Sequence, residues 1–303
     1  MNSSLPRDPA RSAALTPSDL LAVAVEAAAL AADYLRDLDR EDLGREYKTS
    51  SHDIVTVHDR ACEDIIVGAL RGRLPGCRIV GEEGGIRAGS KEANSAGPVG
   101  ADGSGVTFFV DPIDGTSNFA AGLPLFCVSI GVAVGEELVA GVIDAPILGT
   151  VFTAADGPAM IDGREIRPRS TRDAQDALIL SGFPGHRMTA QFPQLAAAAD
   201  AQMDLGFSAV RNLGTAALEL AFVAAGWADA TGLATINPWG VAAGFHIVRR
   251  AGGSIRTWPG DGPVDAADHL RPAYVACTGQ ERLALFDELM DRVQEARDAA
   301  REV

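Results

Sequence analysis

The chain has 303 residues, of which 47% are apolar, so it can bury a substantial core in one large domain or two closely packed ones. Its formal net charge of −15 argues against nucleic acid or an anionic membrane as partners, because both require basic surface. No run approaches the roughly 20 apolar residues that a membrane span needs.

The N-terminus and the cysteines indicate a cellular compartment. The first residues lack the long apolar core of a signal peptide. The four cysteines are scattered, lack CxxC spacing and lie mostly among apolar residues; they are Cys62, Cys77, Cys127 and Cys277. This pattern is typical of free core thiols in a reducing environment, so we expect a cytoplasmic protein.

A disordered tail is predicted over residues 1–15, which are polar with interspersed proline and alanine. Order is predicted to begin at Thr16, which is followed by a proline at the first helical position and an acid in the first turn. The apolar residues that then follow helical spacing are Leu20, Val23, Ala27, Leu30, Ala31 and Tyr34. This pattern predicts a helix with one side facing the core.

Acidic residues mark the ends of the next two predicted elements. Residues 53–59 alternate like a strand and lead into a helical run over residues 60–74, with Asp59 at its start. Taken alone, Asp59 is interpreted as a helix N-cap. The short apolar strand at residues 78–80 is followed by Glu82 and Glu83, so a second strand end presents carboxylates.

The stretch between residues 84 and 105 is rich in Gly, Ala and Ser and is long for a loop in a compact domain. We expect a mobile surface loop, or a lid, beside the site.

The most informative segment follows this loop. Residues 107–110 are β-branched or aromatic and predict a buried strand that ends at Asp111, where α/β proteins usually form their sites. Pro112 fixes its own φ and favours extended geometry at Asp111, so the Asp111 carboxylate, the Ile113 carbonyl and the Asp114 carboxylate are expected to converge. Hard oxygens at such close spacing suit Mg²⁺.

A short helix is predicted to open at Gly115, Thr116 and Ser117, with free N–H groups that would face an anion. A metal ion and a phosphate group would then bind next to each other in the molecule. The alternative is an Asx-rich turn that caps a helix. The complete sequence of residues 110–119 argues against that alternative.

The rest of the chain predicts stacked helix and sheet layers. Short apolar runs divided by turns predict an antiparallel meander over residues 126–166. Strands are then predicted over residues 177–181, 228–233 and 273–277, and helices over residues 214–226, 239–251 and 281–301. We therefore divide the chain into a metal-binding α+β part, residues 16–168, and a C-terminal α/β part, residues 169–303, packed against it.

Together these motifs resemble the Mg²⁺-dependent, Li⁺-sensitive inositol monophosphatase-like phosphatases. The resemblance runs from Lys48 to Gly244 and rests most heavily on Gly-Glu-Glu at residues 81–83 and Asp-Pro-Ile-Asp-Gly-Thr at residues 111–116. It implies the layered αβαβα sandwich of the inositol monophosphatase and fructose-1,6-bisphosphatase type, a homodimer, and hydrolysis of a small phosphorylated metabolite.

The resemblance also implies metal ligands. Glu82, Asp111 and the Ile113 carbonyl would hold a first Mg²⁺, and Asp111 with Asp114 would bridge to a second. A third, weakly held ion would sit on Glu82 with mostly water around it.

Catalytic and phosphate-binding roles follow in the same way. Thr116, supported by Asp59, would activate the water that attacks the phosphomonoester, with no covalent phosphoenzyme. The backbone at Gly115, Thr116 and Ser117 would bind phosphate oxygens. Lys48 lies near this site in the family, although a solvated surface lysine is the alternative, and Asp53 is a further candidate.

Two positions depart from the family's pattern. Where the family has Trp-Asp and so supplies the second metal's last carboxylate, this chain has Trp239-Gly240, so water or Asn237 would have to complete that metal site. Leu233 stands where inositol-specific members carry an acidic residue that contacts sugar hydroxyls, which argues against myo-inositol phosphate as substrate.

These departures leave two functions open. The first is a phosphatase for a sugar, polyol or amino-alcohol phosphate, with histidinol phosphate as one candidate, whose second metal binds weakly. The alternative is a catalytically weakened relative that binds phosphorylated ligands or a protein partner.

Overall fold

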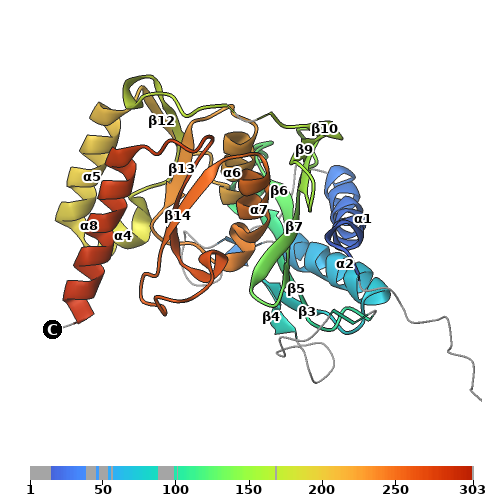
Figure 1. The fold of residues 1–303 in the computed structure, drawn as a ribbon. Coiled ribbons are helices and arrows are strands. Elements are labelled where there is room, and N and C mark those ends of the chain that lie inside the picture. The colour runs from blue at the N-terminus through green and yellow to red at the C-terminus, as the bar shows by residue number, and fades with distance from the viewer. Residues whose placement is uncertain are drawn as a thin grey trace, which may run out of the picture.

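The fold is described from a computed structural model of the chain (Figure 1). The structure describes residues 15–38, 46–47, 54–55, 57–87, 99–100, 102–167 and 169–301. Nearly all of the predicted tail, Lys48, Asp53 and most of the loop predicted between residues 84 and 105 lie outside these ranges.

Helix α1 (Pro17–Arg36) begins as predicted. The Thr16 hydroxyl accepts a hydrogen bond from the Asp19 N–H at 3.1 Å, and the Asp19 carboxylate accepts one from the Thr16 N–H at 2.9 Å, which completes a capping box. The buried side consists of Leu20, Ala24, Ala27, Ala28, Ala31, Ala32 and Leu35. The prediction for Leu30 was wrong: it lies about 2.8 turns beyond Leu20, beside this stripe, and is 48% exposed.

Helix α2 (Val57–Arg73) starts earlier than predicted. Asp59 therefore lies inside the first helical turn and not at the N-cap. The strand predicted ahead of it is reduced to β2 (Ile54–Val55), which pairs with β1 (Glu46–Tyr47) in a small separate sheet.

An eight-stranded sheet carries the predicted meander. Its order is β10-β9-β8-β7-β6-β5-β3-β4, and only β3 and β5 pair in parallel. The prediction of an uninterrupted loop after Gly84 was wrong at its start, because β4 pairs with β3 immediately after the turn. The strands are β3 (Arg78–Gly81), β4 (Gly85–Arg87), β5 (Val106–Asp114), β6 (Cys127–Val134), β7 (Glu137–Ala145), β8 (Thr150–Ala154), β9 (Met160–Ile161) and β10 (Arg164–Glu165).

A five-stranded sheet, ordered β12-β11-β13-β15-β14, follows in the second half. The predicted strands are present as β11 (Leu178–Leu180), β13 (Ala230–Leu233) and β15 (Ala273–Cys277). Four elements were not predicted: β12 (Ala209–Arg211), β14 (Ser254–Trp258), α4 (Gly185–Gln191) and α5 (Pro193–Gly206).

The other helices of the second half lie close to their predicted places. They are α6 (Ala216–Ala224), α7 (Ala242–Arg250) and α8 (Ala284–Arg301). The helix predicted from residue 239 is split, because Pro238–Gly240 forms the separate 3₁₀ turn η2 before α7. Two further 3₁₀ turns are η1 (Ala174–Asp176) and η3 (Asp268–Leu270).

The elements stack as αβαβα, which confirms the predicted fold class (Figure 1). Helices α1 and α2 cover one face of the eight-stranded sheet. Helices α6 and α7 lie between the two sheets and contact both, and α5 and α8 cover the outer side of the five-stranded sheet. All four cysteines are buried with free thiols, as predicted. None of the helices in the described ranges is both long and apolar enough to cross a membrane.

Two glycines bring the middle helix layer unusually close to the eight-stranded sheet. A Cβ atom at Gly131 of β6 would lie 2.5 Å from the Ala242 Cβ, and one at Gly141 of β7 would lie 2.8 Å from the Ala243 carbonyl oxygen. The start of α7 therefore rests directly on the sheet. Turn η2, just ahead of α7, consequently contacts β5.

Replacement of Gly141 by alanine is expected to lower the free energy of unfolding by about 1–3 kcal/mol, because the added methyl group meets the backbone of α7. Urea unfolding monitored by circular dichroism measures the change. Gly157→Ala is the matched control, since nothing lies within 4 Å of its added Cβ. Equal stability of the two variants would contradict the close approach.

Candidate active site

The parallel pairing of β3 and β5 brings two acidic residues together. Gly81 is in register with Val110, so Glu82, which directly follows β3, lies beside Asp111 of β5; that strand continues past the predicted end at Asp111 to Asp114. The Glu82 N–H donates to the Val110 carbonyl at 3.2 Å and extends the pairing by one step. Asp111 is 4% exposed, whereas Glu82 is half-buried.

A buried carboxylate from α2 holds the turn that carries Glu82. Glu63 accepts hydrogen bonds from the N–H groups of Glu83 and Gly84, both at 2.8 Å, and is paired with Arg87 at 2.9 Å. Gly81 leaves room for it, because a Cβ there would lie 2.6 Å from Glu63 Oε2. The sequence analysis missed Glu63, although it lies four residues after Asp59 and therefore on the same helix side.

A bulge in β5 allows Asp111 and Asp114 to serve one site. Residues three apart on a regular strand point to opposite faces. Here Asp111 pairs with Ser129, and Asp114 pairs with Cys127. Between these two pairs β5 advances by three residues, whereas β6 advances by two. The extra residue reverses the alternation and brings both carboxylates to the same side, and Pro112 is tolerated because it lies in this irregular stretch.

Asp114 is anchored by the start of α6. Its Oδ2 accepts hydrogen bonds from the Thr215 hydroxyl at 2.5 Å and from the Ala217 N–H at 2.6 Å. Burial raises the pKa of Asp114 from its ordinary value of 3.8 to about 6, and these hydrogen bonds partly oppose the rise. The sequence predicted a helix over residues 214–226 but assigned Thr215 no role.

Two supports hold Thr215 in place. The Leu213 N–H donates to the buried Glu219 carboxylate at 2.9 Å. The Asn118 amide donates to the carbonyls of Leu125 and Leu213, both at 2.7 Å. Asn118 thereby ties the short helix after the bulge to the segment that anchors Asp114.

Asp111 occupies the most unfavourable electrostatic position of the group. Burial raises its pKa well above the ordinary value, and the neighbouring carboxylates of Glu82, Asp114 and Asp59 raise it further. Its Oδ1 is buried and has no hydrogen-bond partner among the described residues, and the same holds for the Ser129 hydroxyl directly across the strand pair. Paired residues of an antiparallel ladder share a face, so two unsatisfied oxygens lie on the site's side of the sheet.

Thr116 is the second residue after Asp114 and begins α3 (Thr116–Ala120), the short helix that was predicted. Its hydroxyl lies 3.1 Å from Asp59 Oδ1 and 3.0 Å from the Ile113 carbonyl oxygen. Gly115 takes a positive φ of 97°, and a Cβ there would lie 3.0 Å from the Leu125 carbonyl. Glycine is therefore required for the chain to turn from the strand into this helix.

Gly240 faces Asp111. A Cβ atom at Gly240 would lie 4.0 Å from Asp111 Oδ2 and 3.2 Å from the Ile236 Cδ1. A longer acidic side chain at this position would therefore project into the carboxylate group. Asn237 is exposed and lines the neighbouring pocket, and no hydrogen bond joins it to Asp111 in the described structure.

The donor chemistry of this group fits Mg²⁺. Carboxylate and carbonyl oxygens are its preferred ligands, and the unsatisfied Asp111 Oδ1 sits where a cation would relieve the crowding of negative charge. Within the described ranges, no three His, Cys, Asp or Glu side chains stand close enough to hold a metal without adjustment. The Oδ2 of Asp114 is engaged by Thr215 and Ala217.

Two other polar side chains, those of His246 and Ser181, form hydrogen bonds away from the carboxylate group. The Nε2 of His246 is hydrogen-bonded to the Ala155 carbonyl at 2.9 Å within the core. The Ser181 hydroxyl donates to the Gly232 carbonyl at 2.5 Å and accepts from the Phe183 N–H at 2.9 Å. Neither side chain reaches the carboxylate group.

Comparison with known proteins adds an independent observation. A sequence model of the Inositol monophosphatase family matches residues 16–294. A Pseudomonas aeruginosa protein named Nus factor SuhB is 34% identical over 273 residues, which cover 85% of this chain and 92% of the relative. Inositol monophosphatase 1 of Sus scrofa is 30% identical over 243 residues, covering 80% and 84%. The solved extragenic suppressor protein suhB of Bartonella henselae matches with a TM-score of 0.70 and 31% identity, covering 92% and 98%.

The buried carboxylate of Asp114 predicts a pH dependence of stability in metal-free protein. Because its pKa is about 6 when folded and 3.8 ordinarily, the folded state keeps the proton at pH values where the unfolded chain has released it. The resulting stabilisation is complete below pH 3.8 and is lost as the pH rises through 6. Asp114→Asn should therefore reduce the loss of unfolding free energy between pH 4 and 7 by roughly 2 kcal/mol.

Urea unfolding in the presence of a chelator at several pH values measures this effect. The exposed Asp173 provides the control variant Asp173→Asn, which should keep the wild-type pH dependence. A wild-type pH dependence in Asp114→Asn would show that this carboxyl does not titrate as described.

Proposed function

Because the chain belongs to the inositol monophosphatase family, we propose that it is a Mg²⁺-dependent phosphomonoesterase that acts on a small phosphorylated metabolite. The observation that carries the proposal is the buried carboxylate group around Asp111, which includes an unsatisfied oxygen and lies beside Glu82 and Asp114. Such a group is costly without a cation and is suited to hold one.

We assign the metal ligands from this geometry. Glu82, Asp111 and the Ile113 carbonyl would hold one Mg²⁺, and Asp111 with Asp114 would take part in a second, weaker site beside Gly240. When bound, the ion supplies positive charge that polarises the phosphoryl group and favours deprotonation of water. A third ion on Glu82 is part of the same proposal.

Thr116 and Asp59 would form the proton-accepting pair. If the Thr116 hydroxyl donates to Asp59 Oδ1 at 3.1 Å, its oxygen lone pairs remain available to accept a hydrogen bond from the attacking water. The proton would then pass from water to Thr116 and on to Asp59, which α2 holds fully buried. Gly115, Thr116 and Ser117 would contact the phosphate oxygens through their backbone.

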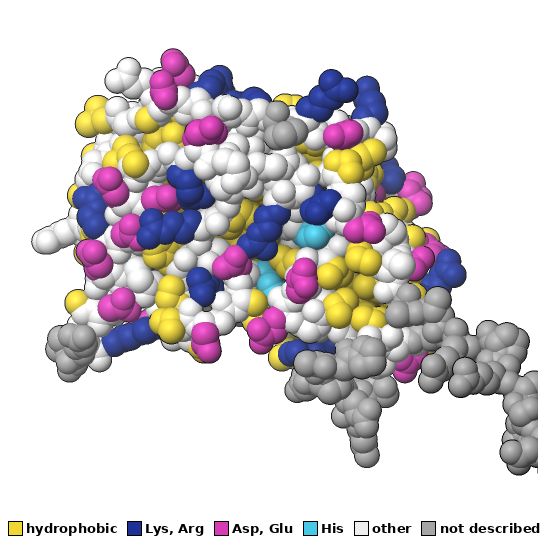
Figure 2. All heavy atoms as spheres, in the orientation of Figure 1, with side chains coloured by type: hydrophobic (Ala, Val, Ile, Leu, Met, Phe, Trp, Pro, Cys, Tyr) yellow, Lys and Arg dark blue, Asp and Glu magenta, His cyan; other side chains and the backbone are white. Residues whose placement is uncertain are grey.

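The substrate and the partners follow from composition and surface. Leu233 offers no acceptor for sugar hydroxyls, so we propose a metabolite other than myo-inositol phosphate. Acidic and basic side chains are interspersed on the face drawn in Figure 2, and the net charge is −15, so nucleic acid is not among the proposed partners. A cytoplasmic homodimer completes the proposal.

One observation favours a second candidate function. Gly240 leaves the side of Asp111 without the carboxylate that the family's pattern supplies, and relatives named Nus factor SuhB carry a name that does not refer to phosphatase activity. The second candidate is a weakened relative that binds a phosphorylated ligand or a protein partner.

Phosphate release from a panel of monoesters tests the first candidate. We expect release that requires Mg²⁺ and stops on chelation. Asp111→Asn should lower kcat/KM by about 100-fold or more, because stabilisation by the ion amounts to several kcal/mol. Asp265→Asn, at an exposed position, should retain wild-type activity. Release that persists in Asp111→Asn would reject the assigned metal site.

Gly240→Asp separates the two candidates. The new carboxylate should lower the Mg²⁺ concentration for half-maximal activity by about tenfold and raise the rate, because it adds an oxygen ligand beside Asp111. Gly240→Asn is the control, since it brings the same bulk against Ile236 without the charge. An absence of release from every monoester in both wild type and Gly240→Asp would favour the binding protein.

A further inference from the structure

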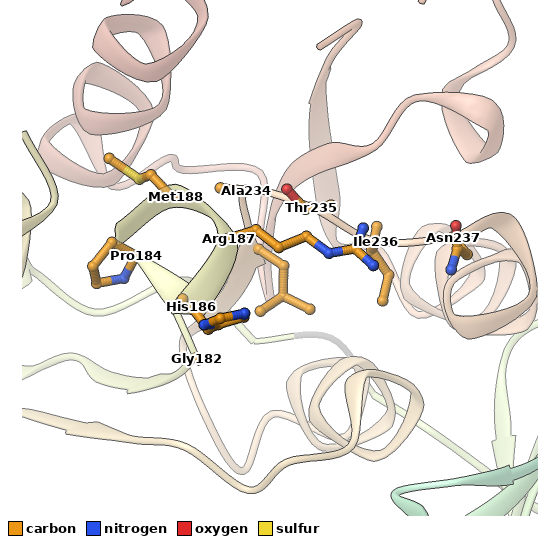
Figure 3. A pocket seen from close by; sticks show the side chains of 11 residues that line it. Gly182, Pro184, His186, Arg187, Met188, Ala234, Thr235, Ile236 and Asn237 are labelled. Carbon is orange, nitrogen blue, oxygen red and sulfur yellow. The ribbon is translucent and has the colours of Figure 1, made fainter. Parts of the chain in front are cut away.

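A pocket of about 270 Å³ opens beside the carboxylate group, between α4 and the segment that follows β13 (Figure 3). Helix α4 contributes Arg187 and the buried Met188, and the opposite wall contains Leu233, Ile236 and Asn237. This volume lies just below the usual range of ligand pockets, so it suits a group of a few carbon atoms.

The pocket adjoins the proposed reaction centre through a single side chain. Ile236 lines the pocket, and its Cδ1 lies 3.2 Å from the position of a Cβ at Gly240. That same position is 4.0 Å from Asp111 Oδ2. A phosphoester held at Asp111 would therefore place its alcohol portion within reach of the pocket.

The charge of the pocket is opposite to that of the chain. The protein has 41 acidic and 26 basic residues, yet no Asp or Glu is found among the described residues that line this pocket. Arg187 is exposed and makes no hydrogen bond or ion pair within the described part of the chain. Figure 3 shows its side chain extended from α4 across the pocket toward Ile236 and Asn237.

From these observations we infer that the leaving group of the substrate carries a carboxylate, which Arg187 binds while Leu233 and Ile236 contact the carbon chain. This inference rests on the proposed function. The planar guanidinium of arginine matches the two oxygens of a carboxylate. Since the described part of the chain offers Arg187 neither an ion-pair partner nor an acidic neighbour in this pocket, its one positive charge matches the single charge of a carboxylate.

A second phosphate group is a poorer match for the same charge balance. A second phosphate group would carry about −1.5 to −2 charges at neutral pH, whereas Arg187 is the sole Lys or Arg among the described residues that line the pocket, which also include His186. The carboxylate is therefore the favoured anion.

Three esters test the inference: glycerol 2-phosphate, 2-phosphoglycerate and glycerol 1,2-bisphosphate. They share the phosphoester and differ in the group that would enter the pocket. Dissociation constants by calorimetry with Mg²⁺ and kcat/KM for phosphate release are measured in parallel. Wild type should favour 2-phosphoglycerate over glycerol 2-phosphate by about tenfold, the effect of one charge-assisted hydrogen bond.

Arg187→Gln should bring the ratio between the two esters close to one, both for the dissociation constants and for kcat/KM. Arg164→Gln is the matched control, because Arg164 is also exposed but lies on β10, at the far edge of the eight-stranded sheet. It should keep the wild-type preference.

An equal affinity of wild type for the carboxylate and neutral esters, or an unchanged preference in Arg187→Gln, would overturn the inference. Stronger binding of the bisphosphate would overturn the choice of a carboxylate. If no ester is hydrolysed although 2-phosphoglycerate binds through Arg187, the proposed phosphatase function fails while the carboxylate site stands.

Discussion

The structure is organised around the crowding of carboxylates at the ends of β3 and β5. Desolvation and mutual repulsion raise the pKa of Asp111 far above its usual range, so ionisation of the whole group is unfavourable unless a cation offsets the charge. Such an arrangement persists only when the surrounding structure determines it strongly. Each neighbouring element can be understood as a part of that support.

The support comes from four separate segments of the chain. Glu63 of α2 fixes the turn that carries Glu82, and the bulge in β5 aligns Asp111 with Asp114. Thr215, at the start of α6, holds the latter carboxylate. The glycines that let α7 rest on β6 and β7 place Gly240 against the same group. Helices on both faces of the eight-stranded sheet therefore serve the site.

The sequence predicts the parts of this arrangement that depend on local pattern. The uninterrupted apolar run of β5, the capping box of α1 and the motif at residues 111–116 are local signals, and the fold class, the strands and the short helix agree with them. The start of α2 depends instead on the pairing of β1 with β2 just before it, so Asp59 was misplaced as a cap.

Elements stabilised by distant contacts left little local signal. Strands β12 and β14 are short and lie at the edges of their sheet, where side chains of mixed polarity satisfy the environment. The pocket lined by Arg187 could not be predicted from the sequence either, because it forms only where α4 meets the segment after β13. Glu63 is the exception, since its spacing of four residues from Asp59 places both on the same side of a helix and could have been recognised in the sequence.

The departures at residues 233 and 240 and the pocket beside them form one electrostatic change. Compared with the family's pattern, both positions lack an acidic side chain, so two negative charges are missing from the edge of the site where the alcohol portion of a substrate would lie. Arg187 adds a positive charge at the same edge. Two unit charges about 4 Å apart near a protein surface interact by about 4 kcal/mol, and the energy falls as their separation grows. Under the proposed function, loss of the two acids would therefore weaken the binding of a second cation and, for the same reason, make the site more tolerant of a substrate with an additional negative charge.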